Sequence, residues 1–171
     1  MTDSEQYQKR YWTELFELRV HVNYLKLYME KSECLDKFIN ISLAITSSSS
    51  IGLWAIWKKY SFLWAIIIAA SQVLNVVNQF LPYKTRIKIT CGILKELEEL
   101  LNSYETKWFD VAEGKLKNDE INKLQFEIRT EKTKIIQKHI GKNTLPEKGR
   151  MFKKAKQLAE IYINNYYGEY K

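Results

Sequence analysis

The chain is poor in proline, glycine and cysteine. Its 171 residues include only two prolines, six glycines and two cysteines. So few helix breakers exclude a collagen-like or Pro/Gly-rich disordered chain. Two cysteines are too few for a small secreted domain held together by disulfides. The alternation of apolar and polar residues that is typical of a β-strand is also missing from the sequence. These absences predict an all-α protein of one domain, or two at most.

Charge is missing from one part of the chain. Residues 38–57 and 60–83 contain no Asp, Glu, Lys or Arg, and only Lys58 and Lys59 separate the two runs. The net charge is +7, and most of the basic excess lies in residues 84–171, which hold nineteen Lys and Arg against thirteen Asp and Glu. The first residues, MTDSEQYQKRYW, are charged and lack the apolar core of a cleavable signal peptide, so none is expected.

The two uncharged runs are long enough to cross a bilayer. A helix that rises about 1.5 Å per residue needs about 20 apolar residues to cross a hydrocarbon core of about 30 Å. We expect spans at about 38–57 and 60–82, joined so tightly that they form an antiparallel hairpin. The competing interpretation is a buried helical hairpin in a soluble bundle, favoured by Ser47–Ser50 and by the amide residues. Against it, four aromatic residues surround the connection as in an interfacial belt: Trp54, Trp57, Tyr60 and Trp64.

Basic residues predict the orientation of the hairpin. The connection carries two lysines, whereas the flanks carry seven basic residues, and the more basic side of a membrane protein stays in the cytoplasm. The prediction is therefore a multi-pass membrane protein with both termini in the cytoplasm. The predicted parts are a cytoplasmic amphipathic helix (1–37), the two-span hairpin (38–83) and a cytoplasmic helical region (84–171). The seven flanking residues are Lys26, Lys31, Lys37, Lys84, Arg86, Lys88 and Lys95.

Polar residues inside the second run fall on one side of the expected helix. At 3.6 residues per turn they cover an arc of about 120°. Polar groups are costly in lipid, so their placement points either to hydrogen bonds between the spans or to a stripe that faces an oligomer axis and lines a water path. A small-ligand site is a third interpretation. The stripe consists of Ser71, Gln72, Asn75, Asn78 and Gln79.

Small residues mark a second face of each expected span. They recur every four residues, a spacing that lets two helix backbones approach closely. We expect these faces to pack against each other within one protomer, which leaves the polar stripe for neighbouring copies. The residues are Ala44, Ser48 and Gly52 in the first span and Ala65 and Ala69 in the second.

Apolar residues at helical spacing flank the hairpin on both sides. One stripe precedes it and another follows it, and we expect the two to pack together. Pro82 predicts a break between the second span and the helix that follows. Two further helices are expected, one beginning near an N-cap at Asn118 and one near a capping box at 144–147 that carries Met151, Ala155, Leu158 and Tyr162. The two stripes are Tyr11, Leu15, Leu18, Val22, Leu25 and Met29, then Ile87, Leu94, Leu97, Leu101, Tyr104, Trp108 and Val111.

A basic cluster lies on the last expected helix. It is interpreted as a solvated face, as a patch that binds anionic lipid headgroups, or as a site for a nucleotide or RNA phosphate. Nothing in the sequence has the spacing of a catalytic or metal-binding constellation, so we expect no enzyme activity, no cofactor and no metal site. The cluster comprises Lys148, Arg150, Lys153, Lys154 and Lys156.

The layout resembles a known bacterial group. A Tyr11–Trp12 start is followed by SSSSIGLWAIW, SFLWAIIIAASQV, a Leu81–Pro82–Tyr83 exit and a helical tail. Over most of residues 7–130 this is similar to the SLATT-type proteins with two transmembrane helices. The resemblance implies a membrane effector of anti-phage or conflict systems, which forms pores or disrupts the membrane when a cytoplasmic sensor protein or a nucleotide signal triggers it.

The sequence thus predicts an all-α protein with a two-helix transmembrane hairpin and a cytoplasmic helical bundle. The leading function is a membrane effector that forms homo-oligomers through its spans. The alternative is a membrane-anchored scaffold or adaptor that holds a cytoplasmic partner without forming a pore. A soluble basic protein that binds nucleic acid is a distant third, and it would not require detergent in fractionation.

Overall fold

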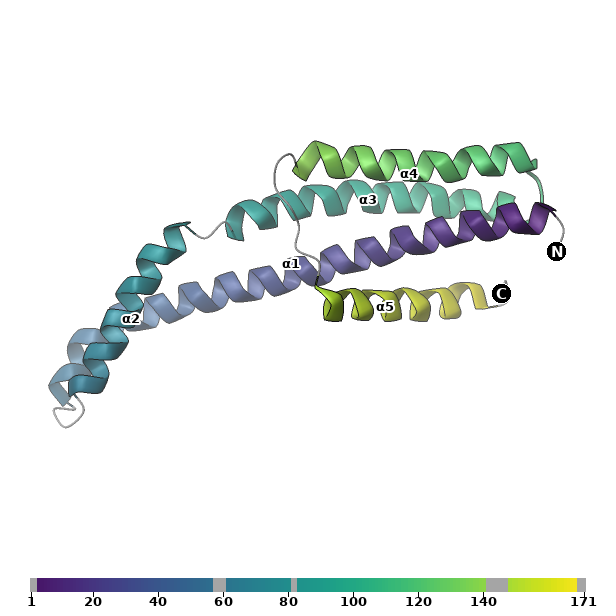
Figure 1. Ribbon diagram of the computed structural model, residues 1–171. Helices are drawn as coiled ribbons and strands as arrows, with labels where there is room; N and C mark the ends of the chain where they lie inside the picture. Colours follow the sequence, from purple (N-terminus) through teal and green to yellow (C-terminus); the bar gives the residue numbers. More distant parts are fainter. Residues whose placement is uncertain (1–2, 57–60, 81–82, 141–147, 169–171) are drawn as a thin grey trace. The chain divides into compact units, whose positions relative to one another are not determined.

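The described part of the chain is entirely helical. The computed structural model describes residues 3–56, 61–80, 83–140 and 148–168, and within its helices it leaves the side chains of residues 3, 46–56, 61, 64, 77–80 and 83–84 undescribed. No strand occurs among the described residues, so the all-α prediction is confirmed. The helices are α1 (Asp3–Ile56), α2 (Ser61–Phe80), α3 (Tyr83–Ala112), α4 (Asn118–Ile140) and α5 (Gly149–Tyr167) (Figure 1).

The chain divides into two compact units. One unit combines Met1–Met29 with Lys88–Lys171, and the other is Glu30–Ile87. We call the first the bundle unit, because the beginning of α1, most of α3, and α4 and α5 form it. We call the second the apolar unit, because it contains the two uncharged runs.

The two predicted apolar stripes form the core of the bundle unit. Every stripe residue of α1 from Tyr11 to Leu25 is buried, as is every stripe residue of α3 from Leu94 to Val111. The two stripes belong to one hydrophobic cluster, so the expected pairing of these helices is confirmed. The hydroxyl of Tyr11, which is fully buried, donates to the carbonyl of Tyr104 at 2.7 Å, so a polar tip in the core is satisfied.

Helix α5 packs through a face that partly matches the predicted one, because Ala155 is buried and Met151 and Tyr162 pack against the core. Its buried residues are Ala155, Ala159, Ile163 and Tyr167, spaced by four. The expected core residue Leu158 is 40% exposed, so that prediction is wrong. Two alanines one turn apart let the backbone of α5 lie close to its neighbours, and the amide of Asn23 on α1 donates to the carbonyl of Ala155.

The turn between α3 and α4 follows the chemistry of a helix end. Gly114 has φ 69°, a left-handed conformation that favours glycine. The N–H of Lys115 donates to the carbonyl of Asp110 and that of Gly114 to Val111, which closes α3 in a Schellman motif. The predicted N-cap Asn118 is off by one residue, because the N–H of Ile121 donates to the carbonyl of Lys117.

Some predicted helix signals cannot be compared with the structure. Pro82 and the capping box at 144–147 lie outside the described residues. Helix α5 ends at Tyr167. The first described turn of α5 begins at Gly149, and Lys148 precedes it in an extended conformation without a side-chain capping bond.

The apolar unit has no core among its described residues. Between Glu30 and Ile87, no described side chain is buried. Within the described part of the chain, no helix is both long and apolar enough to cross a membrane. The two-span hairpin is therefore not confirmed, and the side chains of 46–61 and 77–84, which belong to the expected spans, lie outside the described residues.

Candidate functional site

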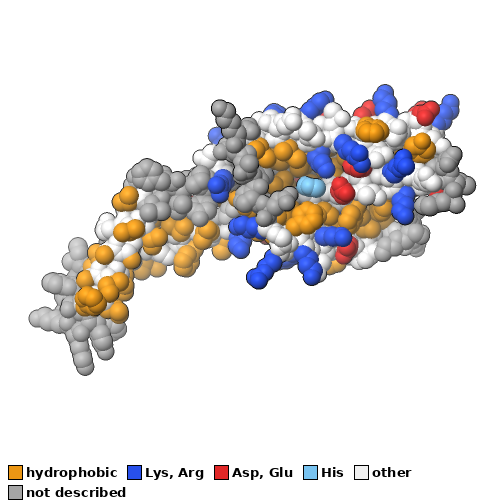
Figure 2. Space-filling model, in the orientation of Figure 1, with side chains coloured by type: hydrophobic (Ala, Val, Ile, Leu, Met, Phe, Trp, Pro, Cys, Tyr) orange, Lys and Arg blue, Asp and Glu red, His pale blue; other side chains and the backbone are white. Residues whose placement is uncertain are grey.

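Large apolar side chains are exposed along the apolar unit. Phe62 is 78% exposed and Phe38 is 67% exposed, although both belong to the uncharged runs. Figure 2 shows orange side chains over much of the drawn face of this unit. Exposed apolar side chains gathered in this way are typical of surfaces that contact lipid or another protein. The exposed residues are Leu35, Phe38, Ile41, Ile45, Phe62, Leu63, Ile66, Ile67, Val73, Leu74 and Val76.

The predicted polar stripe is only partly described. Ser71 donates its hydroxyl to the carbonyl of Ile68 at 2.8 Å, so it needs no partner from another helix. Gln72 and Asn75 are exposed. The side chains of Asn78 and Gln79 lie outside the described residues. Two amides thus remain available on one side of α2, and the role of the stripe stays a prediction.

The small residues of the expected packing faces are exposed where the structure describes them. These are Ala44 on α1 and Ala65 and Ala69 on α2. The side chain of Ser48 and the position of Gly52 belong to the part of α1 without described side chains. The predicted contact between the two small faces is therefore not observed and stays a prediction.

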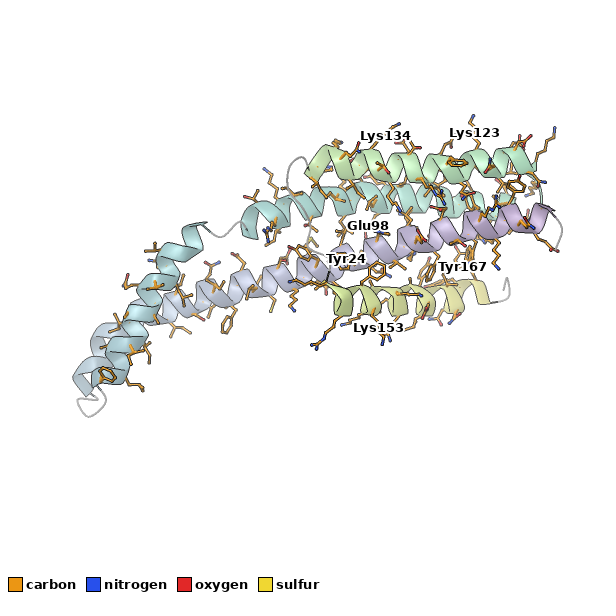
Figure 3. All side chains as sticks on the ribbon, viewed as in Figure 1. Tyr24, Glu98, Lys123, Lys134, Lys153 and Tyr167 are labelled. Carbon is orange, nitrogen blue, oxygen red and sulfur yellow. The ribbon has the colours of Figure 1, made fainter. Side chains whose placement is uncertain are left out.

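The basic cluster lies at the beginning of α5 and is exposed throughout. The backbone N–H of Lys148 donates to the hydroxyl of Tyr24 at 3.2 Å, and its ammonium lies 5.9 Å from the centre of the Tyr28 ring. None of the five cations forms an ion pair with a described residue, and Lys153 points away from the bundle (Figure 3). Cations at a helix N-terminus face the positive end of the helix dipole, so an anionic partner would stabilise them.

One carboxylate joins three helices of the bundle unit. Glu105 on α3 forms an ion pair with Arg19 of α1. Its Oε1 accepts hydrogen bonds from the hydroxyls of Tyr162 and Tyr167 on α5, each at 2.9 Å. Burial and, second, the bond to Glu105 raise the pKa of both tyrosines, so both hydroxyls stay protonated donors. The guanidinium of Arg19 also lies 3.7 Å from the centre of the Tyr162 ring.

A second carboxylate joins α3 to the end of α4. Glu96 Oε1 lies 2.7 Å from Lys138 Nζ and 2.8 Å from His139 Nε2. The hydrogen bond from Lys138, followed by that from His139, holds the pKa of Glu96 below its usual value. No group of His, Cys, Asp or Glu among the described residues has the geometry of a metal site. His139 instead contacts Glu96.

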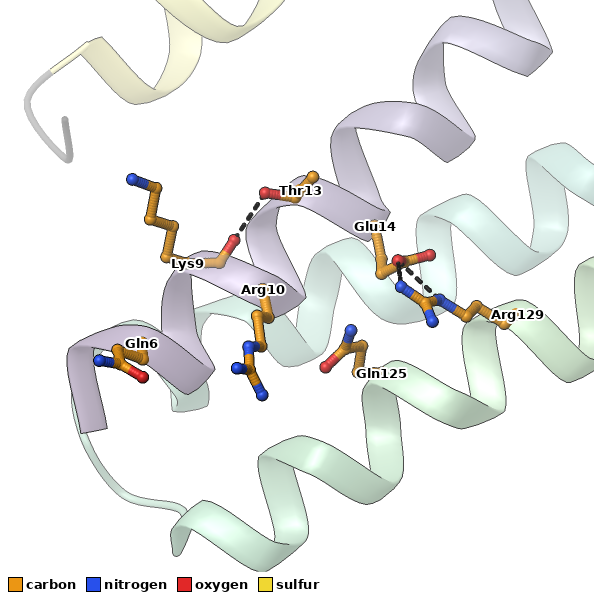
Figure 4. A pocket seen from close by; sticks show the side chains of 7 residues that line it. All are labelled: Gln6, Lys9, Arg10, Thr13, Glu14, Gln125 and Arg129. Atoms are coloured by element: carbon orange, nitrogen blue, oxygen red, sulfur yellow. Dashed lines mark hydrogen bonds and ion pairs between the residues drawn. The ribbon is translucent and has the colours of Figure 1, made fainter. Parts of the chain in front are cut away.

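A pocket opens between the beginning of α1 and α4. It has a volume of about 370 Å³ and is lined mainly by polar and cationic side chains (Figure 4). Arg129 of α4 donates its Nε to Glu14 Oε1 at 2.7 Å, and its Nη2 contacts the same oxygen. The lining residues are Gln6, Lys9, Arg10, Thr13, Glu14, Gln125 and Arg129.

Sequence reasoning missed these three polar sites of the bundle unit. Their partners lie 42 to 115 residues apart along the chain, as in the pairs Lys138–Glu96 and Arg129–Glu14, so spacing alone gives no signal. No family model, curated protein or solved structure matches the chain. The resemblance to SLATT-type proteins therefore stays a prediction.

Proposed function

We propose that the apolar unit inserts into the bacterial inner membrane as a two-span hairpin, with both termini in the cytoplasm. The chain then acts as a homo-oligomeric membrane effector of a defence or conflict system. One observation carries the proposal: the described core lies entirely in the bundle unit, while large apolar side chains of the apolar unit are exposed. The bundle unit has its own hydrophobic core, whereas the exposed apolar side chains of the apolar unit are unfavourable in water.

A bilayer would surround these exposed side chains with apolar lipid. Full burial of a large apolar side chain contributes about 1.5–3 kcal/mol. The ten exposed ones within the two uncharged runs are 37–78% exposed, so they would contribute on the order of 10 kcal/mol in a bilayer. An antiparallel pair of helices satisfies its own backbone hydrogen bonds, as a segment in lipid must. The absence of charge from 38–57 and 60–83 removes the largest cost of insertion.

The amide stripe of α2 supports assembly of several copies. Gln72 and Asn75 are exposed and polar, and amides in lipid gain free energy when they hydrogen-bond to another helix or to water. We assign these amides to contacts between protomers, around an axis that admits water when the assembly opens. The bundle unit would receive the trigger, a cytoplasmic sensor protein or a nucleotide signal.

A second candidate is the scaffold without a pore. The surface of α5 favours it, because Leu158 is 40% exposed and Ile161 is 56% exposed beside the basic cluster. A mixed apolar and basic helix face suits a cytoplasmic partner with an acidic surface. In that case the hairpin serves only as an anchor, and the amides of α2 tolerate replacement.

Membrane potential separates the two candidates. The full chain is expressed in bacteria with a potential-sensitive dye, and Asn75→Leu/Asn78→Leu is compared with Val73→Leu/Val77→Leu, a control that the helical period places opposite the polar stripe. The effector proposal predicts depolarisation by the wild type and the control, and little by the amide variant. Equal depolarisation by all three would remove the stripe from the mechanism. No depolarisation by any of them, even with the neighbouring genes present, would favour the scaffold.

A further inference from the structure

The pocket between α1 and α4 has the chemistry of an anion site. We propose that it binds a small ligand through a phosphate group. Its lining side chains carry three cations and one carboxylate, a net charge of +2. This inference concerns the bundle unit alone, so it does not depend on insertion of the apolar unit into a membrane.

Two of the cations have no counter-charge in the described structure. Lys9 and Arg10 lie on the first turns of α1, are exposed, and form no ion pair with a described residue. Arg10 contacts only the ring of Tyr7, whose centre lies 5.7 Å from its guanidinium carbon. Figure 4 shows Arg10 directed toward Gln125, whereas Lys9 is directed away from both. The guanidinium of Arg10 presents several N–H donors, which suit the oxygens of a phosphate.

The third cation is held in place by a buried carboxylate. Glu14 is 5% exposed and takes both hydrogen bonds on one side of the Arg129 guanidinium. The side chain of Arg129 is 52% exposed, and the guanidinium has further N–H groups that do not reach Glu14. The charges of Glu14 and Arg129 therefore compensate each other. The contact also fixes the direction of the remaining N–H donors of Arg129, as in a preorganised binding site.

A buried amide completes the site. Gln125 is only 6% exposed, and its side chain forms no hydrogen bond with any described residue. Figure 4 shows the amide reaching from α4 toward α1, between Arg10 and Glu14. The amide is not among the fully enclosed polar atoms without a partner, so it opens into the pocket, where a ligand oxygen would accept from its N–H₂ group. This is the observation that distinguishes the pocket from an ordinary basic surface.

The pocket limits the ligand by size and by chemistry. About 370 Å³ is at the small end of the range for ligand sites. None of its lining residues is aromatic, so the pocket offers no ring for a nucleobase to stack on. The recognised group is therefore the phosphate itself, and the rest of the ligand is small or lies outside the pocket.

The test uses the full chain in mild detergent and pyrophosphate as the probe. Calorimetric titration at fixed ionic strength should show saturable binding. Because charge-assisted hydrogen bonds are lost, Arg10→Gln should weaken binding about tenfold, whereas Lys9→Gln should weaken it less, since Lys9 is directed away from Arg10 and Gln125. Gln125→Leu should weaken it as well. Lys123→Gln, which removes the same charge from an exposed site on α4 outside the lining, should change the dissociation constant less than twofold.

Three results would overturn the inference. One is the absence of saturable binding by the wild type up to millimolar pyrophosphate. Another is an equal loss of affinity in Lys123→Gln and Arg10→Gln, which would show attraction to general basic charge. The third is unchanged affinity in Gln125→Leu with its fold intact by circular dichroism, because the buried amide would then play no part.

Discussion

The imidazole ring of His139 lies in the space that a side chain at Gly92 would occupy. A methyl group added at Gly92 would come within 2.8 Å of His139 Cε1 and 3.0 Å of Nδ1. The close approach of α3 and α4 places the ring so that its Nε2 meets Glu96, one turn further along α3. Glycine within a helix is ordinarily unfavourable, so its presence here has a packing reason.

The first prediction concerns Gly92→Ala in two backgrounds. In a His139→Ala protein the space beside residue 92 is free, so the substitution should stabilise the fold by about 1 kcal/mol through helix propensity. In the wild type the ring of His139 must move away and lose its contact with Glu96. The gain in stability from helix propensity should therefore be lost or reversed. Denaturant unfolding of the four variants measures the difference. The same effect of Gly92→Ala in both backgrounds would show that the ring does not lie there.

The second prediction concerns acid stability. The pKa of Glu96 lies below 4.5 in the folded chain, because Lys138 and His139 stabilise its charged form, and it returns to about 4.5 on unfolding. Its contribution is therefore present above 4.5 and is lost as the pH falls through the folded pKa. The gap in melting temperature between wild type and Glu96→Gln should close as the pH falls below 4.5.

Glu99→Gln is the matched control for that experiment. It removes the same charge from α3, three residues away, but Glu99 is exposed and forms no ion pair with a described residue. At pH 7 it should lower the melting temperature less than Glu96→Gln does. A gap between wild type and Glu96→Gln that stays constant down to pH 3 would contradict the ion pair.

The third prediction concerns the carboxylate that joins three helices. Glu105→Ala leaves Arg19 and the hydroxyls of Tyr162 and Tyr167 without their acceptor inside the bundle. Removing one partner of a largely buried pair should cost about 3–5 kcal/mol in the free energy of unfolding. Tyr167→Phe should cost about 1 kcal/mol, one hydrogen bond.

A surface carboxylate sets the scale for that measurement. Glu131 pairs with Lys134 on the exposed side of α4, so Glu131→Gln should cost less than about 0.5 kcal/mol. Urea unfolding followed by circular dichroism gives all three values. Equal costs for Glu105→Ala and Glu131→Gln would mean that Glu105 does not hold α5 against the bundle.

Much of the bundle could be predicted from the sequence. Apolar residues are spaced by three and four from Tyr11 to Leu25 and similarly from Leu94 to Val111. This spacing places them on one helix face whatever the neighbouring helices are, so their burial could be predicted from the sequence. On α5 two faces compete, and Leu158 looks as apolar as Ala159. The small residue was buried because a close approach of backbones suits it, which depends on the neighbouring helices and not on the local pattern.

The polar sites could not be predicted for a related reason. The chain has 27 Lys and Arg, and nothing in the spacing of Arg129 or Arg10 separates them from the solvated ones. Which cation meets a buried acceptor depends on the side on which α4 packs against α1. Glu14 was a visible sign in the sequence, since it lies three residues after Tyr11 and four before Leu18, on the core face, but its partner lies 115 residues away.

The most direct test of membrane insertion asks on which side residue 59 emerges. Lys59→Cys, with both native cysteines changed to alanine, is expressed in bacteria and treated with a membrane-impermeant maleimide before and after lysis. Proteins that keep only Cys34 or only Cys91, both exposed in the structure, are the controls for the two flanks. The account predicts labelling of residue 59 in intact spheroplasts, and of Cys34 and Cys91 only after lysis. Labelling of residue 59 only after lysis would contradict the two-span hairpin.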